Sequence, residues 1–430
     1  MRRIGIIGAG QAGLYLGISL VDAGYAVTLF SEFTPESILN GKLMATPNLL
    51  PDALQLERQL GLAFWDDQFP GCNQLCNDVC DSDGNLALVV SSTLERCWQA
   101  VDQRLKFSCW MQEFVRRGGE LVIRTMTPRD LEECVQNYDL VVVSTGRGSL
   151  KTLFERDAQR SIHGKPKRHL AAVIVTGLKG ESMAEHTIKL TTLPGIGEIF
   201  QFPFYDKSKN SSHTIFFEAH PGGTMDRFSQ IQSGQQLLEV SKKLMEQLTP
   251  WDYEVIKDME LTDELAWLRG VITPTVRQPV GRLPDGARVM GIGDAVILND
   301  PIAGQGANNA TKMAHLVVQR IIDHGNRRFD ESWMQAVFDE FWEYCQYANA
   351  LADCLLTPPA HLQELVVAMA QNPEVARDYI NGVNHPPSLF PWFFEPEETK
   401  KYLAQKNTKG VGSDYSTSQL SQTQLLVRAR

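Results

Sequence analysis

Two glycine-rich stretches at opposite ends of the chain contain the residue types that bind the phosphates of a dinucleotide. The first has the spacing Gly-x-Gly-x-x-Gly and consists of Gly8, Ala9, Gly10, Gln11, Ala12 and Gly13. Gly8 permits a tight turn, Gly10 lets a pyrophosphate approach the backbone, and Gly13 lets a helix pack closely on a strand. The N-terminus of that helix offers unpaired N–H groups and a positive dipole end to the phosphates. This stretch predicts a dinucleotide cofactor, and both NAD and FAD satisfy it.

The second stretch, residues 291–308 (GIGDAVILNDPIAGQGAN), distinguishes the two cofactors. Asp294 follows an apolar strand, and ligands of an open α/β sheet lie at the carboxyl ends of its strands. A carboxylate there suits the ribityl hydroxyls of a flavin, which need an acceptor. The helix that begins next would direct its N-terminus at the isoalloxazine edge that becomes anionic on reduction. The sequence therefore predicts FAD, with contacts in this stretch from Asp294, Pro301, Gly304, Gly306, Ala307 and Asn308.

The elements that position the first stretch form a strand–helix–strand unit. Residues 3–8 are an apolar strand, a helix follows as far as Gly24, and residues 26–30 form a second strand that ends at Ser31 and Glu32. Glu32 can accept hydrogen bonds from ribose hydroxyls, as the acidic residue of such units does. Ser31 and Glu32 are therefore added to the predicted FAD contacts.

The remaining patterns indicate a second domain. A helix near 95–117 precedes strands at 121–124 and 139–144, the latter closed by Thr145 and Gly146, and alternation over 168–220 predicts an antiparallel sheet. The predicted fold class is α/β: a Rossmann-type FAD-binding domain with an inserted antiparallel-sheet substrate domain and C-terminal helices. The expected boundaries are 1–160 and 276–330 for the two parts of the FAD-binding domain, 161–275 for the substrate domain, 331–400 for the C-terminal helices and 401–430 for a flexible tail.

Composition excludes several classes of partner. The net charge of -10, with no basic stripe, argues against nucleic acid and anionic membranes. No apolar run is long enough to cross a membrane, and the N-terminus lacks a cleavable signal pattern, so a cytoplasmic protein is expected. The evenly spaced Cys72, Cys76 and Cys80 have no matching Cys or His group with ligand spacing, so no metal site is predicted.

Taken together, the two glycine motifs resemble those of the p-hydroxybenzoate-hydroxylase-type flavoprotein monooxygenases over most of residues 1–325. Within that fold, residues 138–155 (YDLVVVSTGRGSLKTLFE) lack the Asp-Gly pair typical of single-component hydroxylases and are similar to the styrene and indole monooxygenases. Residues 100–105, 194–198 and 299–308 agree with that branch. The resemblance implies that Lys42, Arg104 and Met126 contact the FAD, and that Thr145 and Gly146 belong to its site.

The resemblance also implies a reaction. Members of this branch receive reduced FAD from a separate small flavin reductase and use O₂ to form a C4a-hydroperoxyflavin, which epoxidises or hydroxylates an aromatic or alkenyl small molecule. A dry apolar pocket then matters more than an acid–base pair, and no residue is assigned as catalytic. The predicted pocket wall comprises Ala45, Pro47, Phe202, Phe204, Phe217 and Pro301. His220 is interpreted as an ordinary loop histidine, while Glu198 and Glu218 are interpreted as solvent-facing.

Three departures leave alternatives open. Ala45 stands where the branch has Asn, Lys42 stands where it has Arg, and residues 70–80 (PGCNQLCNDVC) replace a segment that bears aromatic and His residues. A single-component NAD(P)H-dependent hydroxylase and a non-oxygenase flavin-binding redox protein remain alternatives. A halogenase is disfavoured because no Trp-x-Trp-x-x-Pro element is found. The substrate and the oligomeric state are not specified, and a homodimer stays open.

Overall fold

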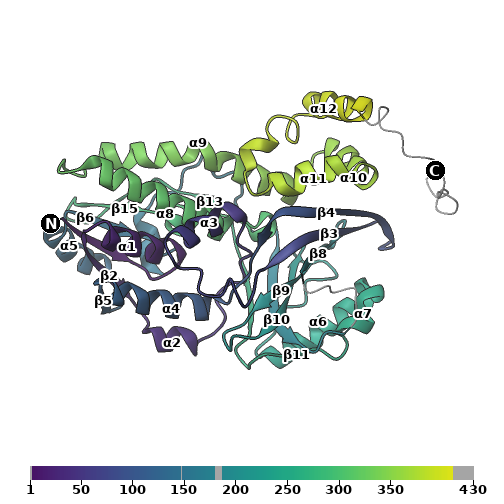
Figure 1. Cartoon of the computed structure of the whole chain (residues 1–430), viewed down its shortest axis with the longest axis horizontal. Coiled ribbons are helices and arrows are strands. Elements are labelled where there is room, and N and C mark those ends of the chain that lie inside the picture. The colour runs from purple at the N-terminus through teal and green to yellow at the C-terminus, as the bar shows by residue number, and fades with distance from the viewer. Residues whose placement is uncertain (1, 147, 180–185, 410–430) are drawn as a thin grey trace.

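The computed structural model describes residues 2–146, 148–179 and 186–409, and Figure 1 shows two large sheets with helices around them. The first sheet has six strands in the order β14–β15–β6–β1–β2–β5. Their bounds are Val280–Arg282, Arg288–Gly291, Leu140–Val143, Arg3–Ile7, Ala26–Ser31 and Glu120–Ile123. All neighbours in this sheet are parallel except β14 and β15. The sheet is of the Rossmann type, as predicted, and near-continuous apolar strands such as β1 suit burial on both faces.

The second sheet has eight strands and is mixed rather than purely antiparallel. Seven lie in the order β11–β7–β10–β9–β8–β3–β4, and β12 also pairs with β7. The bounds of β11, β7, β10, β9, β8, β3, β4 and β12 are Glu260–Leu261, His169–Thr176, Ser211–Ala219, Gly197–Tyr205, Thr187–Leu193, Cys72–Cys80, Leu86–Trp98 and Trp267–Val271. Only the pairing of β3 with β8 is parallel. A separate two-stranded sheet pairs β13 (Thr275–Val276) with β16 (Ile297–Leu298), which lies within the second glycine-rich stretch.

Helices cover the first sheet and join it to the second. α1 (Gln11–Asp22) contacts both α4 (Gln103–Arg116) and α8 (Gln305–His324), and α3 (Pro51–Gln59) contacts α8. α9 (Glu331–Leu356) lies along α8, as Figure 1 shows. Smaller helices α2 (Pro35–Leu39) and α5 (Pro128–Asn137) pack on α4 and β6.

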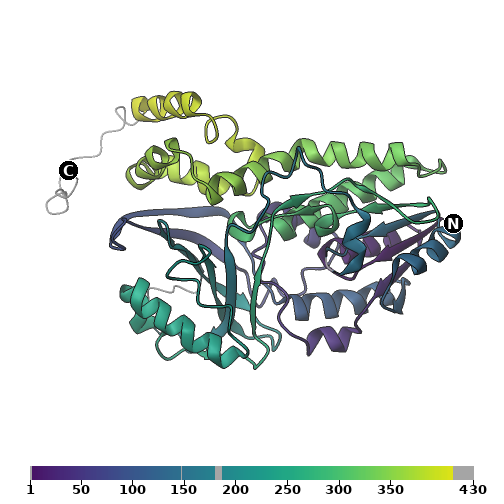
Figure 2. The same cartoon turned by 180° about the vertical axis from the view of Figure 1, so that it is seen from behind.

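The two faces of the second sheet are covered by different parts of the chain. On the outer face, α6 (Gly234–Leu248) and α7 (Pro250–Ile256) lie at the end of the molecule far from the first sheet, which Figure 2 shows from behind. The inner face packs towards the 3-10 helix η4 (Pro301–Ala303) that leads into α8. α10 (His361–Gln371) and α11 (Pro373–Gly382) cover β4, and α12 (Pro396–Lys409) packs on α10. The chain also forms the 3-10 helix η1 (Ser149–Leu153) after β6 and the 3-10 helix η5 (Pro386–Leu389) after α11.

Several expectations about individual segments differ from the structure. The segment near 95–117 is not one helix, because β4 runs to Trp98 and α4 begins only at Gln103, where the Asp102 side chain caps it. The segment 70–80 forms β3, which together with β4 joins the second sheet although both lie within residues 1–160. Residues 401–409 continue α12, and residues 410–430 of the expected tail lie outside the described residues.

Within the described ranges, no helix combines the length and the apolar character needed to span a membrane.

Candidate active site

The two glycine motifs are in direct contact, although they lie at residues 8–13 and 291–308 of the sequence. Gly293 has a φ of 56°, and a Cβ added to it would lie 3.1 Å from the Cβ of Ala12 in the first turn of α1. Gly146, at the end of β6, lies against Asp294, since a Cβ there would be 2.4 Å from the Cβ of Asp294. The carboxyl ends of β1, β6 and β15 therefore meet at one edge of the first sheet.

The glycines of the first motif have the geometry that a close phosphate contact needs. Gly8 has a φ of 113°, which side chains rarely adopt. A Cβ on Gly13 would lie 2.0 Å from the carbonyl oxygen of Gly8, so only glycine lets α1 pack this closely on the turn. Gly10, by contrast, faces open space, because a Cβ there would meet nothing within 4 Å. A ligand can thus approach the backbone at Gly10 without displacing protein atoms.

Both helix N-termini at this edge lack side-chain caps. α1 begins after Gly10 and α8 begins after Gly304, and neither cap residue has a side chain to accept from the first N–H groups. Gly304 and Gly306 also face open space. Unpaired N–H groups and two positive dipole ends are therefore available to anionic groups of a ligand. This arrangement fits the pyrophosphate at α1 and the pyrimidine edge of a flavin at α8.

Several side chains predicted to contact the FAD have partners inside the protein. Arg104 is fully buried, and its five donors go to Asp102, Asp263 and the carbonyl oxygen of Gly41. The Gln11 amide donates to Glu57 and Thr311. These contacts hold the chain segments around the site together.

The side-chain amide of Asn308 also bonds within the protein: it donates to the carbonyl oxygens of Asn48 and Gly304 and accepts from the N–H of Leu50. At these positions the backbone, rather than the side chain, is left to face a ligand.

The other predicted contacts are spread around the same region. Lys42 is exposed, its Nζ lies 3.7 Å above the ring of Trp267, and partial burial followed by repulsion from Arg269 lowers its pKa. Ser31 exchanges hydrogen bonds with the backbone of Phe33. Glu32 and Asp294 are exposed, Met126 is buried in the main core, and Ala9, Thr145, Gly146, Pro301 and Ala307 are half-buried.

The predicted pocket wall divides between the two faces of the second sheet. Phe202 and Phe204 lie on the inner face, in one cluster with Ile302 and Ala303 of η4. Phe217 lies on the outer face, where its ring packs against Phe228 at 5.7 Å. Its assignment to the pocket wall is therefore not supported by its position, because successive side chains of a strand point to opposite faces. Ala45 and Pro47 are half-buried in the loop before α3.

The inner face carries an apolar cluster that the sequence analysis missed. Leu170, Ala172 and Phe216 form it, with Phe200, Leu268 and Ile272 packed against them and only partly covered. The rings of Phe200 and Phe216 are 5.7 Å apart. Strict alternation along β10 places Phe216, the neighbour of Phe217, on this face. The signal was present in the sequence, but the choice between two adjacent phenylalanines needs the tertiary structure.

Buried carboxyl groups lie beside this apolar cluster. Glu198 and Glu218 are directly opposite each other on β9 and β10, with 9% and 0% of their surface exposed. Both were interpreted as solvent-facing, which is wrong, because they occupy inward positions of the strands. Arg168 neutralises Glu198 through two hydrogen bonds of 2.7 and 2.9 Å. Glu218 receives no such partner.

Glu218 instead faces Asp300, which immediately precedes η4. Burial first, then repulsion from Asp300 and Glu198, raises the pKa of Glu218 well above its usual range. Burial likewise raises the pKa of Asp300 to about 6, although the N–H of Ile302 and the charge of Arg168 oppose the shift. Among the described protein groups, neither Glu218 oxygen nor Asp300 Oδ2 has a donor. A proton held between the two carboxyl groups would satisfy both, and the raised pKa of Glu218 favours its neutral form.

His220 follows β10 and lies in the field of the same cluster. Burial, and then the positive charge of Arg168, lowers its pKa. The imidazole is therefore neutral at pH 7, and the charged groups on this part of the inner face are the Arg168–Glu198 pair and Asp300. In the part of the chain that the structure describes, no group of three or more His, Cys, Asp or Glu side chains could hold a metal ion.

Comparisons with known proteins agree with this geometry. The family model described as "Styrene monooxygenase A putative substrate binding domain" matches residues 146–254. Styrene monooxygenase StyA of Pseudomonas fluorescens is 26% identical over 417 residues, which are 94% of this chain and 98% of that protein. A second StyA, from Pseudomonas sp, is 26% identical over 412 residues, 94% of this chain and 98% of that protein.

A solved structure shares the fold at low identity. The flavin-dependent brominase Bmp2 superposes with a TM-score of 0.67 at 15% identity, covering 95% of this chain and 99% of that one. At such identity the likeness concerns the fold alone.

Proposed function

Because the chain is a styrene monooxygenase-like, flavin-dependent monooxygenase, we propose that it works with reduced FAD supplied by a separate flavin reductase. It transfers one oxygen atom of O₂ to an aromatic or alkenyl small molecule, with styrene, the substrate named for its relatives, as the first candidate. The observation that carries this proposal is that α1 and α8, whose N-termini after Gly10 and Gly304 are uncapped, pack on each other. The residues that lead into α8, Ile302 and Ala303, belong to the apolar inner face.

The residues present fit FAD. The open space at Gly10 and the N-terminus of α1 would hold the pyrophosphate, and the exposed Glu32 at the end of β2 would accept from the adenosine ribose. Asp294 lies at the carboxyl end of β15, where it would accept from the ribityl chain. The N-terminus of α8 would stabilise negative charge on the reduced ring. When bound, the flavin supplies the activation of O₂.

The chain's own contribution is to orient an apolar substrate and to exclude water. Phe200, Leu268 and Ile272 present partly covered apolar surface on the inner face. Phe200 and Leu268 also pack against the cluster that contains Ile302 and Ala303, which lead into α8. Water exclusion protects a reactive oxygen species from unproductive breakdown. The neutral Glu218 and the paired Arg168 keep this surface free of uncompensated charge apart from Asp300, which is consistent with an uncharged substrate.

One feature supports a separate reductase. The strand β6 is followed by Ser144, Thr145 and Gly146, without the Asp-Gly pair that single-component hydroxylases carry there.

The test is anaerobic. Purified protein is reconstituted with FAD and mixed with NADH and, separately, with NADPH, while the flavin absorbance is followed. No bleaching is expected. Chemically reduced FAD, air and styrene should then give styrene oxide in the presence of the protein. Fast bleaching by either nucleotide would contradict the need for a reductase, and peroxide release without product for a panel of alkenes would favour a redox protein.

A further inference from the structure

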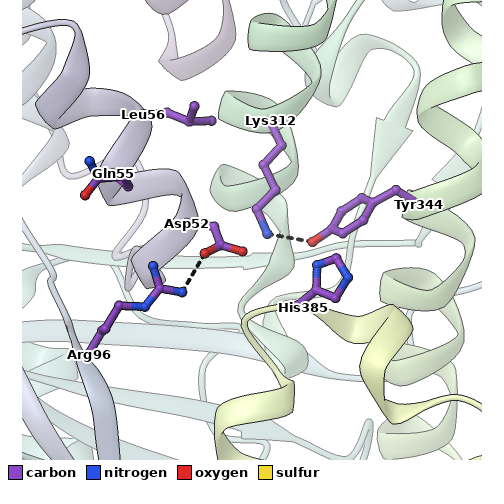
Figure 3. Close-up of a pocket in the computed structure, with 7 residues that line it drawn as sticks. All are labelled: Asp52, Gln55, Leu56, Arg96, Lys312, Tyr344 and His385. Atoms are coloured by element: carbon purple, nitrogen blue, oxygen red, sulfur yellow. Dashed lines mark hydrogen bonds and ion pairs between the residues drawn. The ribbon is translucent and has the colours of Figure 1, made fainter.

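A cavity of about 350 Å³ lies beside α8, and its lining includes no residue assigned to the flavin or the substrate (Figure 3). α3, β4, α8, α9 and the loop after α11 each contribute to it. Its lining residues are Asp52, Gln55, Leu56, Arg96, Lys312, Tyr344 and His385. None of these residues has a role in the function proposed above, so the cavity requires its own explanation.

Lys312 supplies a half-buried cation to this cavity. Its Nζ donates to the Tyr344 hydroxyl at 2.6 Å and to the carbonyl oxygen of Asn384 at 2.8 Å. An ammonium group has three N–H donors, and no acceptor for the third is found among the described residues. Figure 3 shows the side chain reaching from α8 into the space between Asp52 and Tyr344.

A second cation, Arg96, lies across the cavity on β4. Its Nη2 donates to Asp52 Oδ1 at 2.6 Å, and its remaining donors have no hydrogen-bond partner among the described protein groups. The Arg96 side chain is 55% exposed, so it can turn towards a ligand in the opening. Leu56 and the rings of Tyr344 and His385 provide apolar contact surface beside these donors.

The charges around Lys312 sum to a single positive charge near pH 7. Burial lowers the pKa of Lys312 to about 8, while Asp52 and Cys345 oppose this effect and Arg96 adds to it. Burial opposes ionisation of Asp52, but hydrogen bonding with Asn384 and Arg96 holds its pKa below the usual range. Burial, and then Lys312, lowers the pKa of His385, so its ring is neutral. Burial raises the pKa values of Tyr344 and Cys345, so both stay protonated.

We propose that this cavity is a binding site for a small organic carboxylate with an apolar body. The carboxylate accepts the third N–H of Lys312 and the remaining donors of Arg96, and the body packs on Leu56 and the two rings. A monoanion neutralises the net charge of the site. A phosphate dianion would exceed it and would lie close to the Asp52 carboxylate, which disfavours the phosphate class.

The test is calorimetric titration of the purified full-length chain with benzoate, with benzamide as its uncharged analogue and inorganic phosphate as the dianion. One benzoate per chain is expected to bind, benzamide more weakly by at least about tenfold, and phosphate more weakly than benzoate. Lys312→Met should weaken benzoate by at least about tenfold. Lys243→Met, an exposed lysine on the distant helix α6, should leave the affinity unchanged.

Two further variants separate direct contact from structural damage. Asp52→Asn removes the competing negative charge and should strengthen benzoate binding severalfold, which general loosening of the fold would not do. In the parent, affinity should fall roughly tenfold per pH unit above pH 8, as the Lys312 ammonium is lost. Lys312→Arg should keep the affinity and flatten this profile, because Arg stays charged.

Failure of benzoate to bind, or binding that Lys312→Met leaves intact, would overturn the proposal, the second by placing benzoate at another site. Tighter binding of phosphate than of benzoate would overturn the assignment to carboxylates. If Lys312→Met does not fold, the pH profiles of the parent and of Lys312→Arg decide the question. None of these titrations requires flavin or turnover, so their outcome is independent of the proposed monooxygenase function.

Discussion

The carboxyl edge of the first sheet, where we propose that the flavin binds (the flavin edge), differs in construction from the inner face of the second sheet, where we propose that the substrate binds. At the flavin edge, backbone N–H groups and missing Cβ atoms create the site, and the most polar side chains, such as Arg104 and Asn308, bond to the protein itself. On the inner face, side chains from non-consecutive strands create the surface, including the Glu218–Asp300 carboxyl pair. A backbone site depends on a short local pattern, whereas a side-chain site depends on which strands become neighbours.

The largest effect should come from Arg104→Met. It leaves the buried Asp102 carboxylate and Asp263 without their shared partner, so the free energy of unfolding should fall by about 3–5 kcal/mol. Urea unfolding measures this loss. Arg58→Met, whose pair with Asp66 is about one-third exposed, should cost less than about 1 kcal/mol. A stable Arg104→Met protein that no longer binds flavin would show instead that Arg104 contacts the cofactor.

Glu218→Gln should change how stability depends on pH. The pKa of Asp300 is about 6 in the folded protein and near 4 when unfolded, so the folded state keeps a proton that the unfolded chain loses. The parent therefore loses stability as pH rises from about 4 through 6, by up to about 3 kcal/mol. Glu218, whose own pKa is raised well above its usual range, adds a further loss of the same sign as pH rises. The variant has a neutral amide, so it lacks the part due to Glu218 and keeps the part due to the buried Asp300. Its Tm should exceed that of the parent at pH 8 but not at pH 4.

The matched control for that prediction is Glu239→Gln, on the exposed side of α6. It should leave the difference in Tm between pH 4 and pH 8 as it is in the parent. A Glu218→Gln protein that becomes relatively less stable as pH rises would mean that Glu218 is ionised in the folded state.

An intermediate effect is expected from Gly10→Ala and Gly306→Ala. A methyl group at either position meets no protein atom, so Tm should stay constant or rise slightly. It would, however, occupy the space through which the backbone approaches the flavin, and FAD affinity should fall by about tenfold, or 1.4 kcal/mol. Quenching of flavin fluorescence measures the affinity. Gly164→Ala, also in open space but in the exposed segment before β7 and not in either glycine motif, should change neither quantity.

The smallest effect should distinguish two adjacent phenylalanines. Phe216→Leu alters the partly covered inner face and should change KM for an alkene such as styrene, with little loss of stability. Phe217→Leu removes volume from the outer core and should lower stability by about 1 kcal/mol while leaving KM unchanged. The reverse result would place the substrate on the helix-covered face of the sheet.

Local sequence patterns were sufficient to predict much of the first sheet. The strands before Gly8 and before Gly146, and the helices after Gly10 and Gly304, follow from apolar runs and glycine spacing alone. The contact of Gly293 with Ala12 could be expected because ligand sites of such sheets gather at the carboxyl ends of strands. What the patterns could not supply was the partner of each polar side chain. From the sequence alone, Arg104 could be interpreted as a free cation. In the fold all its donors are used, because Asp263 of the expected substrate domain lies beside it.

The second sheet shows why its strand pairing and its buried carboxyl pair were not predicted from the sequence. Strand β3 is itself rich in Cys and polar residues, and it pairs with β8 through residues more than 100 positions apart in the sequence. Glu198 and Glu218 lie at inward positions of otherwise apolar strands, a signal that could have marked them as buried. Asp300, which shares the proton, comes from a segment about 80 residues later. No short stretch of the sequence contains both Glu218 and Asp300, so their pairing could not be predicted from local patterns.

The contact between Gly293 and Ala12 also has a consequence for biosynthesis. Gly13 ends the first glycine motif and Asn308 ends the second, and these two residues are 295 positions apart in the sequence. At about 5–20 residues per second, the first half waits roughly 15–60 s on the ribosome before the second half is made. A nascent chain that ends before α8 therefore has the phosphate-binding turn but no complete flavin site. If FAD binds where we propose, it can be incorporated only after α8 has been synthesised.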